Sequence, residues 1–154
     1  MKISYKIQPD LNRLSAKLPA DVQEARRAGM INIVTEVEAR ARKRAPVKTS
    51  NLANTGTSDV NADGTIGTVK FTAPYAEYVH RGTGLYGPRK QMIRPKQKKA
   101  LYWPGAAHPV RAVRGMPAQQ FLLRAAEDSD IEALYIEGAE RYLNRALGSA
   151  ERLR

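Results

Sequence analysis

Alternating polar and apolar side chains mark the first element of the chain. Every second residue of 2–7 is apolar, which is the period of a strand with one buried face. Two further strands are predicted over residues 57–61 and 65–71, on either side of the turn sequence Asn-Ala-Asp-Gly at 61–64. Asp-Gly favours a tight hairpin because such turns require positive φ.

Residues 19–44 carry the pattern of one long amphipathic helix. Pro19 suits the first helical turn, and Pro46 ends the helix. Basic residues gather before that end, where the helix dipole is negative. Small and apolar residues recur at steps of three or four, so we expect one face to cover a sheet. That face consists of Val22, Ala25, Gly29, Ile33, Val37, Arg40 and Ala41.

The middle of the chain predicts shorter elements. Residues 47–56 are rich in Thr, Ser, Asn and Gly and indicate a loop, in which Thr49 or Ser50 caps a turn that places Leu52 in the core. Residues 74–80 suit one or two helical turns. Residues 81–94 combine glycine, proline and positive charge and indicate a long loop, and such loops usually bind a partner or remain mobile until assembly.

The remaining third predicts a second strand pair and two helices. The strands are expected over 99–103 and 110–113, with Leu101 and Trp103 pointing into the core. Helices are expected over 118–127, with Phe121 and Leu122 buried, and over 130–147. Ser129-x-x-Glu132 has the spacing of a capping box at the start of the last helix.

This order of elements predicts an α+β fold in a single domain over residues 1–154. We expect a mostly antiparallel sheet packed by the long N-terminal helix and the C-terminal helices. A length of 154 residues, 42% of them apolar, suits one core. No apolar run approaches the length of a membrane span, and the N-terminus lacks a secretory pattern. Synthesis in the cytoplasm, without membrane contact, is therefore expected.

Charge is concentrated in one segment. The chain has a formal charge of +11, and residues 81–114 hold nine basic and no acidic residues. Such a field favours an anionic partner, either nucleic acid or an acidic protein surface, although a solvated basic face is the simpler interpretation. The candidate interaction residues are Arg81, Arg89, Lys90, Arg94, Lys96, Lys98 and Lys99.

Candidate chemistry is sparse. The absence of cysteine excludes disulfides, thiolate metal sites and cysteine nucleophiles. His80 and His108 have no second histidine at helical spacing, and Gly82-Thr83-Gly84 lacks the Gly-Lys-Ser/Thr of a phosphate-binding loop. We therefore predict no catalytic, metal or cofactor site and no enzymatic activity. A hydrolase acting through Glu77 or His108 is the rival that these residues leave open.

Four strings of residues occur in a distinctive order and spacing. Together they resemble a family of tailed-phage tail components described as tail-completion or head–tail joining proteins. Ser50, His80 and Gln120 depart from the family pattern, which has glycine, glutamate and proline at those places. The matching residues are Ala45-Pro46-Val47 with Thr49 and Leu52; Tyr75-Ala76-Glu77-Tyr78-Val79 with Gly82-Thr83-Gly84; Pro95-Lys96 with Lys98-Lys99-Ala100-Leu101; and Phe121-Leu122.

The resemblance implies a structural virion subunit, made in the host cytoplasm and located in the phage tail or neck. Such a subunit assembles with copies of itself as a ring, with sixfold symmetry as the expectation. Its other partners are the tail tube, tail terminator or head–tail connector proteins, and contact with DNA that passes through is left open. The alternative is a nucleic-acid-binding module that uses residues 81–114, with Tyr102 and Trp103 stacking on bases.

Overall fold

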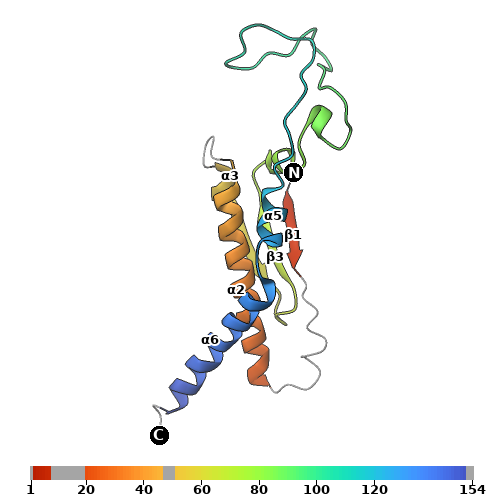
Figure 1. Cartoon of the computed structure of the whole chain (residues 1–154). Coiled ribbons are helices and arrows are strands. Elements are labelled where there is room, and N and C mark those ends of the chain that lie inside the picture. The colour runs from red at the N-terminus through yellow and green to blue at the C-terminus, as the bar shows by residue number, and fades with distance from the viewer. Residues whose placement is uncertain (1, 8–19, 47–50, 152–154) are drawn as a thin grey trace. The chain divides into compact units, whose positions relative to one another are not determined.

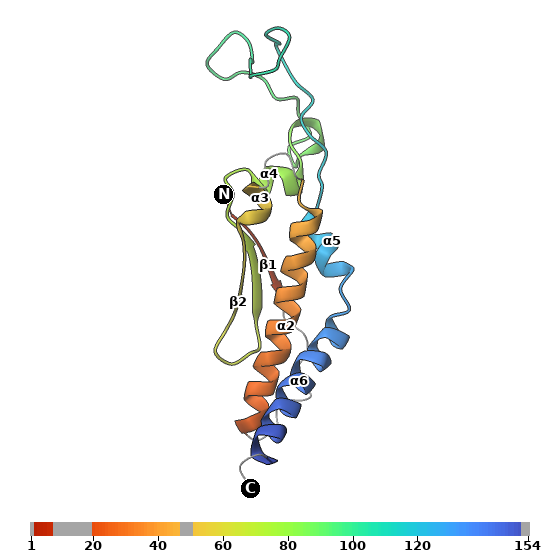
Figure 2. The same cartoon turned by 90° about the vertical axis from the view of Figure 1, so that its left-hand side faces the viewer.

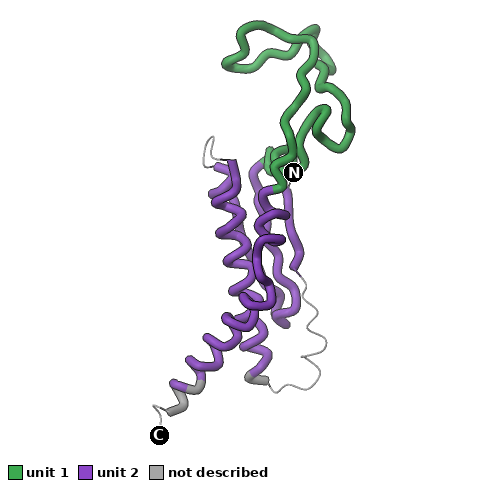
Figure 3. The backbone as a smooth tube through the Cα atoms, viewed as in Figure 1, with its two compact units in different colours: residues 1, 74–120 green, residues 2–73, 121–154 purple. Residues whose placement is uncertain are grey.

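A computed structural model describes residues 2–7, 20–46 and 51–151. The chain forms two compact units, unit 1 from Pro74–Gln120 and unit 2 from Lys2–Ala73 with Phe121–Arg154 (Figure 3). The α+β class, with an antiparallel sheet packed by a long N-terminal helix and C-terminal helices, is confirmed. The elements are β1 (Ile3–Ile7), α2 (Ala20–Arg44), α3 (Asn51–Asn54), β2 (Gly56–Val60), β3 (Gly67–Phe71), α4 (Ala76–Arg81), the 3-10 helix η1 (Gly84–Tyr86), α5 (Phe121–Glu127) and α6 (Ile131–Glu151).

The sheet of unit 2 has three antiparallel strands in the order β1-β3-β2. The predicted hairpin is formed by β2 and β3, and the predicted first strand pairs with β3 from the other side. Alternation along β3 buries Val69 and Phe71 and exposes Lys70. Ser4 and Thr57 lie opposite Lys70 in the register and are also exposed. One face of the sheet is therefore apolar and the other polar.

Helix α2 lies between this sheet and α6 (Figures 1 and 2). Met30 and Val34 face the sheet at Gly67, where an added Cβ would lie 2.3 Å from Val34 Cγ1. Because α2 is covered on two sides, its buried surface is wider than the single predicted face, which omitted Met30 and Val34. The prediction that this helix covers a sheet is confirmed.

The opposite side of α2 contacts α6 closely. A Cβ placed on Gly138 would lie 2.7 Å from Asn32 Cβ and 2.8 Å from Ala28 O, so only a glycine permits this separation of the two helices. Asn32 Nδ2 also donates a 2.8 Å hydrogen bond to Leu134 O. The crossing of α2 and α6 is thus fixed by backbone contact and by one polar side chain.

Helix α5 closes the core beside α2. Phe121 meets Phe71 edge to face, with ring centroids 5.1 Å apart. Burial of each such ring contributes about 1.5–3 kcal/mol, and the paired geometry adds about 1 kcal/mol. Phe121 and Leu122 are buried, as predicted, and so is Leu52.

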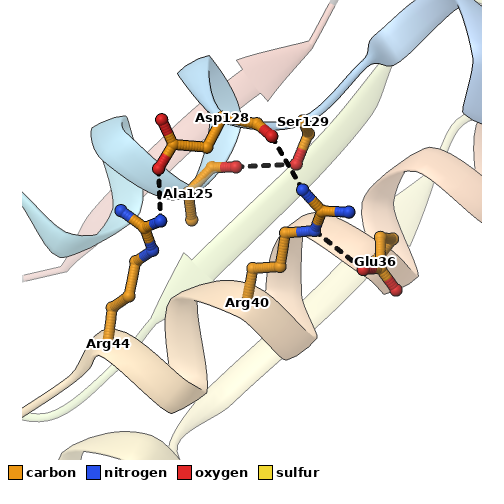
Figure 4. A network of polar contacts seen from close by, with 6 residues as sticks. All are labelled: Glu36, Arg40, Arg44, Ala125, Asp128 and Ser129. Carbon is orange, nitrogen blue, oxygen red and sulfur yellow. Dashed lines mark hydrogen bonds and ion pairs between the residues drawn. The ribbon is translucent and has the colours of Figure 1, made fainter.

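A polar network joins the α5–α6 corner to α2 (Figure 4). Arg40 Nη1 donates to Asp128 O at 2.7 Å, while its Nε pairs with Glu36. Arg44 forms an ion pair with the Asp128 carboxylate. These groups are partly exposed, so each pair is worth at most about 1 kcal/mol, and the network orients the corner more than it stabilises the fold.

Three local predictions are wrong. Residues 51–54 form α3 rather than a loop, whereas the predicted caps at positions 49 and 50 lie outside the described residues. The penultimate helix begins at Phe121 instead of residue 118. The capping box at Ser129 is not formed, because Ser129 is buried and its Oγ donates to Ala125 O. Asp130 Oδ1 accepts the Ala133 N–H instead and caps α6.

Within the part of the chain that the structure describes, none of the helices has the length and apolar character needed to cross a membrane.

The contact between α2 and α6 predicts a difference between two glycines of the same helix. Gly138→Ala should lower the free energy of unfolding by about 2 kcal/mol, because the new methyl meets backbone and Cβ atoms that cannot move aside. Gly148→Ala has open space around it and should raise stability by up to about 1 kcal/mol through helix propensity. Urea unfolding followed by circular dichroism measures both. Equal effects of the two substitutions would contradict the close crossing.

Candidate functional site

Unit 1 is organised by two antiparallel chain segments, residues 79–85 and 114–120, which we call the arm base (Figure 3). Thr83 N donates to Met116 O at 2.9 Å, and Leu85 N donates to Arg114 O at 2.8 Å. The Thr83 hydroxyl accepts the Met116 N–H at 2.9 Å. Further along, the amides of Gln119 and Gln120 donate to the carbonyls of residues 79 and 80. This ladder holds the two ends of a long excursion together.

Glycine is required where the two segments of the arm base touch. Gly84 and Gly115 both have positive φ, and a Cβ on either would lie 2.2 Å from a backbone oxygen of the opposite segment. The backbone amides of Thr83 and Leu85 already donate to carbonyls. The string at 82–84 is therefore a structural turn, in which the Thr83 amide is not available to a phosphate.

Residues 88–113, which we call the basic arm, leave the base and return to it. The β-type backbone pairing within the arm consists of two isolated antiparallel bridges, Ile93 with Val113 and Leu101 with Val110. The strands predicted over 99–103 and 110–113 are thus not formed. Proline and glycine interrupt the segment at 104–105 and 109, and the arm has no second layer against which a strand would pack. None of its residues is buried.

The arm exposes apolar as well as charged side chains. Trp103 keeps 46% of its surface exposed, Tyr102 keeps 68%, and Leu101 is half-buried. The expectation that Leu101 and Trp103 point into a core is therefore wrong, because the arm has no core to receive them. Met92 and Ile93 are exposed too. The nucleic-acid alternative had placed Tyr102 and Trp103 at the surface, whereas the exposure of Met92 and Ile93 was not predicted.

The seven predicted interaction residues separate into two groups. Arg81 is the last residue of α4 in the arm base and lies 3.4 Å from the Glu77 carboxylate. The other six are exposed on the basic arm, and within the described residues none of them forms an ion pair. These six are Arg89, Lys90, Arg94, Lys96, Lys98 and Lys99.

The electrostatic character of the arm is uniform. No acidic residue occurs from 81 to 114, so the cations repel one another and keep a positive field around the exposed aromatic rings. Exposed aromatic, methionine and arginine side chains are enriched at protein interfaces, whereas lysine is depleted there. The arm can therefore bind an anionic partner that also offers apolar contact.

Other chemistry is not assembled in the described ranges. Across residues 2–7, 20–46 and 51–151, no three His, Asp or Glu side chains gather where a metal ion would fit. His80 lies in the arm base, where burial and the neighbouring Arg81 lower the pKa of its imidazole. Both effects disfavour the charged form.

Comparisons with protein-family models, with curated proteins and with solved structures found no match to this chain.

The arm base predicts an asymmetry between glycines of unit 1. Gly115→Ala should open the base, because its methyl would overlap the Thr83 carbonyl. Hydrogen exchange at the Thr83 and Leu85 amides should accelerate at least about tenfold. Gly105→Ala, at a similar positive φ but with nothing within 4 Å, should leave that exchange unchanged. Equal acceleration in both variants would show that backbone strain, and not the contact, is responsible.

The lowered pKa of His80 predicts a pH dependence. The imidazole of His80 binds a proton more weakly in the folded chain than in the unfolded chain. The contribution of His80 to the free energy of unfolding is therefore fully present above the ordinary histidine pKa of about 6.5 and is lost as pH falls below it. Thermal unfolding between about pH 7.5 and about pH 5.5 should show this loss, and His80→Gln should reduce it. An NMR titration that placed the pKa of His80 above 6.5 would contradict the prediction.

Proposed function

We propose that this chain is a structural subunit of a tailed-phage particle, which acts in tail completion or head–tail joining by self-assembly and by contact with neighbouring tail or connector proteins. The observation that carries the proposal is the basic arm, an exposed excursion with no buried residue. The described residues of the four strings support it, since Leu52, Phe121 and Leu122 are buried in unit 2. The two middle strings lie in unit 1, near the arm base and on the arm.

The energetics of the arm support a role in assembly. Ordering one residue costs about 1–2 kcal/mol of conformational entropy, and folding normally offsets that cost by burial. The arm buries none of its residues and has two isolated bridges, so the offset within the chain is small. A neighbouring subunit that covers Tyr102 and Trp103 would supply the missing burial. Arms of this kind are expected in proteins that gain structure from contact with others.

A nucleic-acid-binding module is the second candidate. Exposed Tyr102 and Trp103 offer stacking, and six cations of the arm that form no ion pair among the described residues offer phosphate contact. This alternative predicts a mobility shift of single-stranded DNA by the monomer that weakens steeply with salt. The aliphatic side chains of Met92 and Ile93 favour a protein partner, because they add contact area that neither bases nor phosphates require.

The proposal predicts that arm charge is needed for particle formation. Phage carrying R89E, K90E and R94E together should lose infectious titre by at least about a hundredfold, since reversal places acids where the partner is anionic. The variant protein should keep its circular dichroism spectrum, because these side chains are exposed and make no ion pair among the described residues. Titre and the protein content of purified particles are the measurements.

A matched control changes the same charge elsewhere. Lys2, Lys6 and Lys70 are exposed on unit 2, and their joint reversal to glutamate should leave the titre nearly unchanged. Full infectivity of the arm variant would overturn the proposal. So would the absence of the wild-type protein from purified particles.

A further inference from the structure

The outer face of α6 carries a stripe that matches the basic arm in chemistry. Glu132, Ile136, Glu140 and Leu143 follow one another at helical steps of four, four and three, so they lie on one side of the helix. All four are exposed, with 47% of Ile136 and 37% of Leu143 accessible. We call these residues the α6 stripe. Acidic and apolar side chains alternate along it.

Contacts of α6 with α2 establish that the stripe faces away from α2. Gly138 meets Asn32 and Ala28 on α2, and Tyr135 packs against Gly29. The stripe residues lie on the opposite side of α6 from Gly138, as their exposure indicates. Their apolar side chains are therefore not used by the fold of unit 2.

The segment that contains much of the α6 stripe and the segment that contains the basic arm carry opposite charges. Residues 125–140 contain six acidic residues and no basic one, while residues 81–114 contain nine basic residues and no acidic one. Within the described residues, Asp128 is paired with Arg44 and Glu137 with Arg141, whereas Glu132 and Glu140 form no ion pair. The carboxylates on the stripe are thus available to an incoming cation.

We infer that the basic arm of one copy binds the α6 stripe of a second copy. Tyr102 and Trp103 cover Ile136 and Leu143, and cations of the arm pair with Glu132 and Glu140. The inference rests on the proposed function, because it specifies how the subunits assemble. The two surfaces are different, so the contact is head-to-tail, and successive contacts generate a ring or an open chain of subunits.

A charge-swap experiment tests this contact on the full chain. The arm variant carries R89E, K90E, R94E, K96E, K98E and K99E, which changes the charge of residues 81–114 from +9 to −3 because each reversal contributes two units. The stripe variant carries E132K and E140K. Its matched control, E24K and D59K, reverses two exposed acids away from the stripe. Sedimentation velocity over a range of concentrations measures self-association of each protein and of an equimolar mixture of the two variants.

Wild type and the matched control should associate, and more weakly as salt rises from about 0.1 M to about 0.5 M. The arm variant and the stripe variant should each associate at least tenfold more weakly. Their mixture should recover association, because the reversed arm now meets a reversed stripe. A mixture that stays as weak as its components would overturn the inference, and so would wild-type association of the stripe variant.

Failure of the inference differs from failure of the proposed function. If the arm folds back on its own chain, wild type sediments as a monomer at every concentration, and the inference is wrong while the protein is still found in particles. If the arm binds DNA instead, single-stranded DNA shifts wild type and the stripe variant alike. If the protein is absent from particles although the charge swap succeeds, the proposed function is wrong and the contact between copies stands.

Discussion

The packing of α2 between the sheet and α6 is the interaction on which the rest of the structure depends. The apolar face of the three-stranded sheet needs a second layer to cover it, and α6 likewise has one side that must be covered. Helix α2 gives each of them a partner, with Met30 and Val34 toward the sheet and Gly29 toward α6. Each contact requires a glycine in the element that faces α2, Gly67 in β3 and Gly138 in α6. The other side of the sheet and the other side of α6 do not contact α2.

The core of unit 2 and the basic arm differ in how far they bury their apolar side chains. Unit 2 buries a core of its own, through contacts such as that between Phe71 and Phe121, and leaves Ile136 and Leu143 exposed on the α6 stripe. Unit 1 is held at its base by backbone hydrogen bonds and glycine contacts. Beyond the base, the basic arm has no buried residue. A rigid base with an unburied arm is suited to presenting side chains to a partner. The proposed virion role and the proposed contact with the α6 stripe both follow from that division.

Much of the fold could be predicted from the sequence because its signals are local. Alternation, Asp-Gly and helical spacing identified β1, the β2–β3 hairpin and α2, and the excess of basic residues identified the arm. The burial of Met30 depends on which elements cover α2, and the capping role of Asp130 depends on the burial of Ser129 beside α5. The predicted burial of Trp103 was wrong for a similar reason. A strand buries a side chain only against a second layer, and the sequence does not reveal that the arm lacks such a layer.

Trp103 is the only tryptophan of the chain and lies on the arm, so its fluorescence reports directly on whether the arm becomes covered. The decisive measurement is acrylamide quenching and emission wavelength of Trp103 over a range of protein concentrations, with light scattering on the same samples. The account predicts that quenching falls and emission shifts to the blue as the native mass rises. Growth of the native mass with Trp103 still fully quenched, or a constant mass with Trp103 exposed throughout, would contradict it.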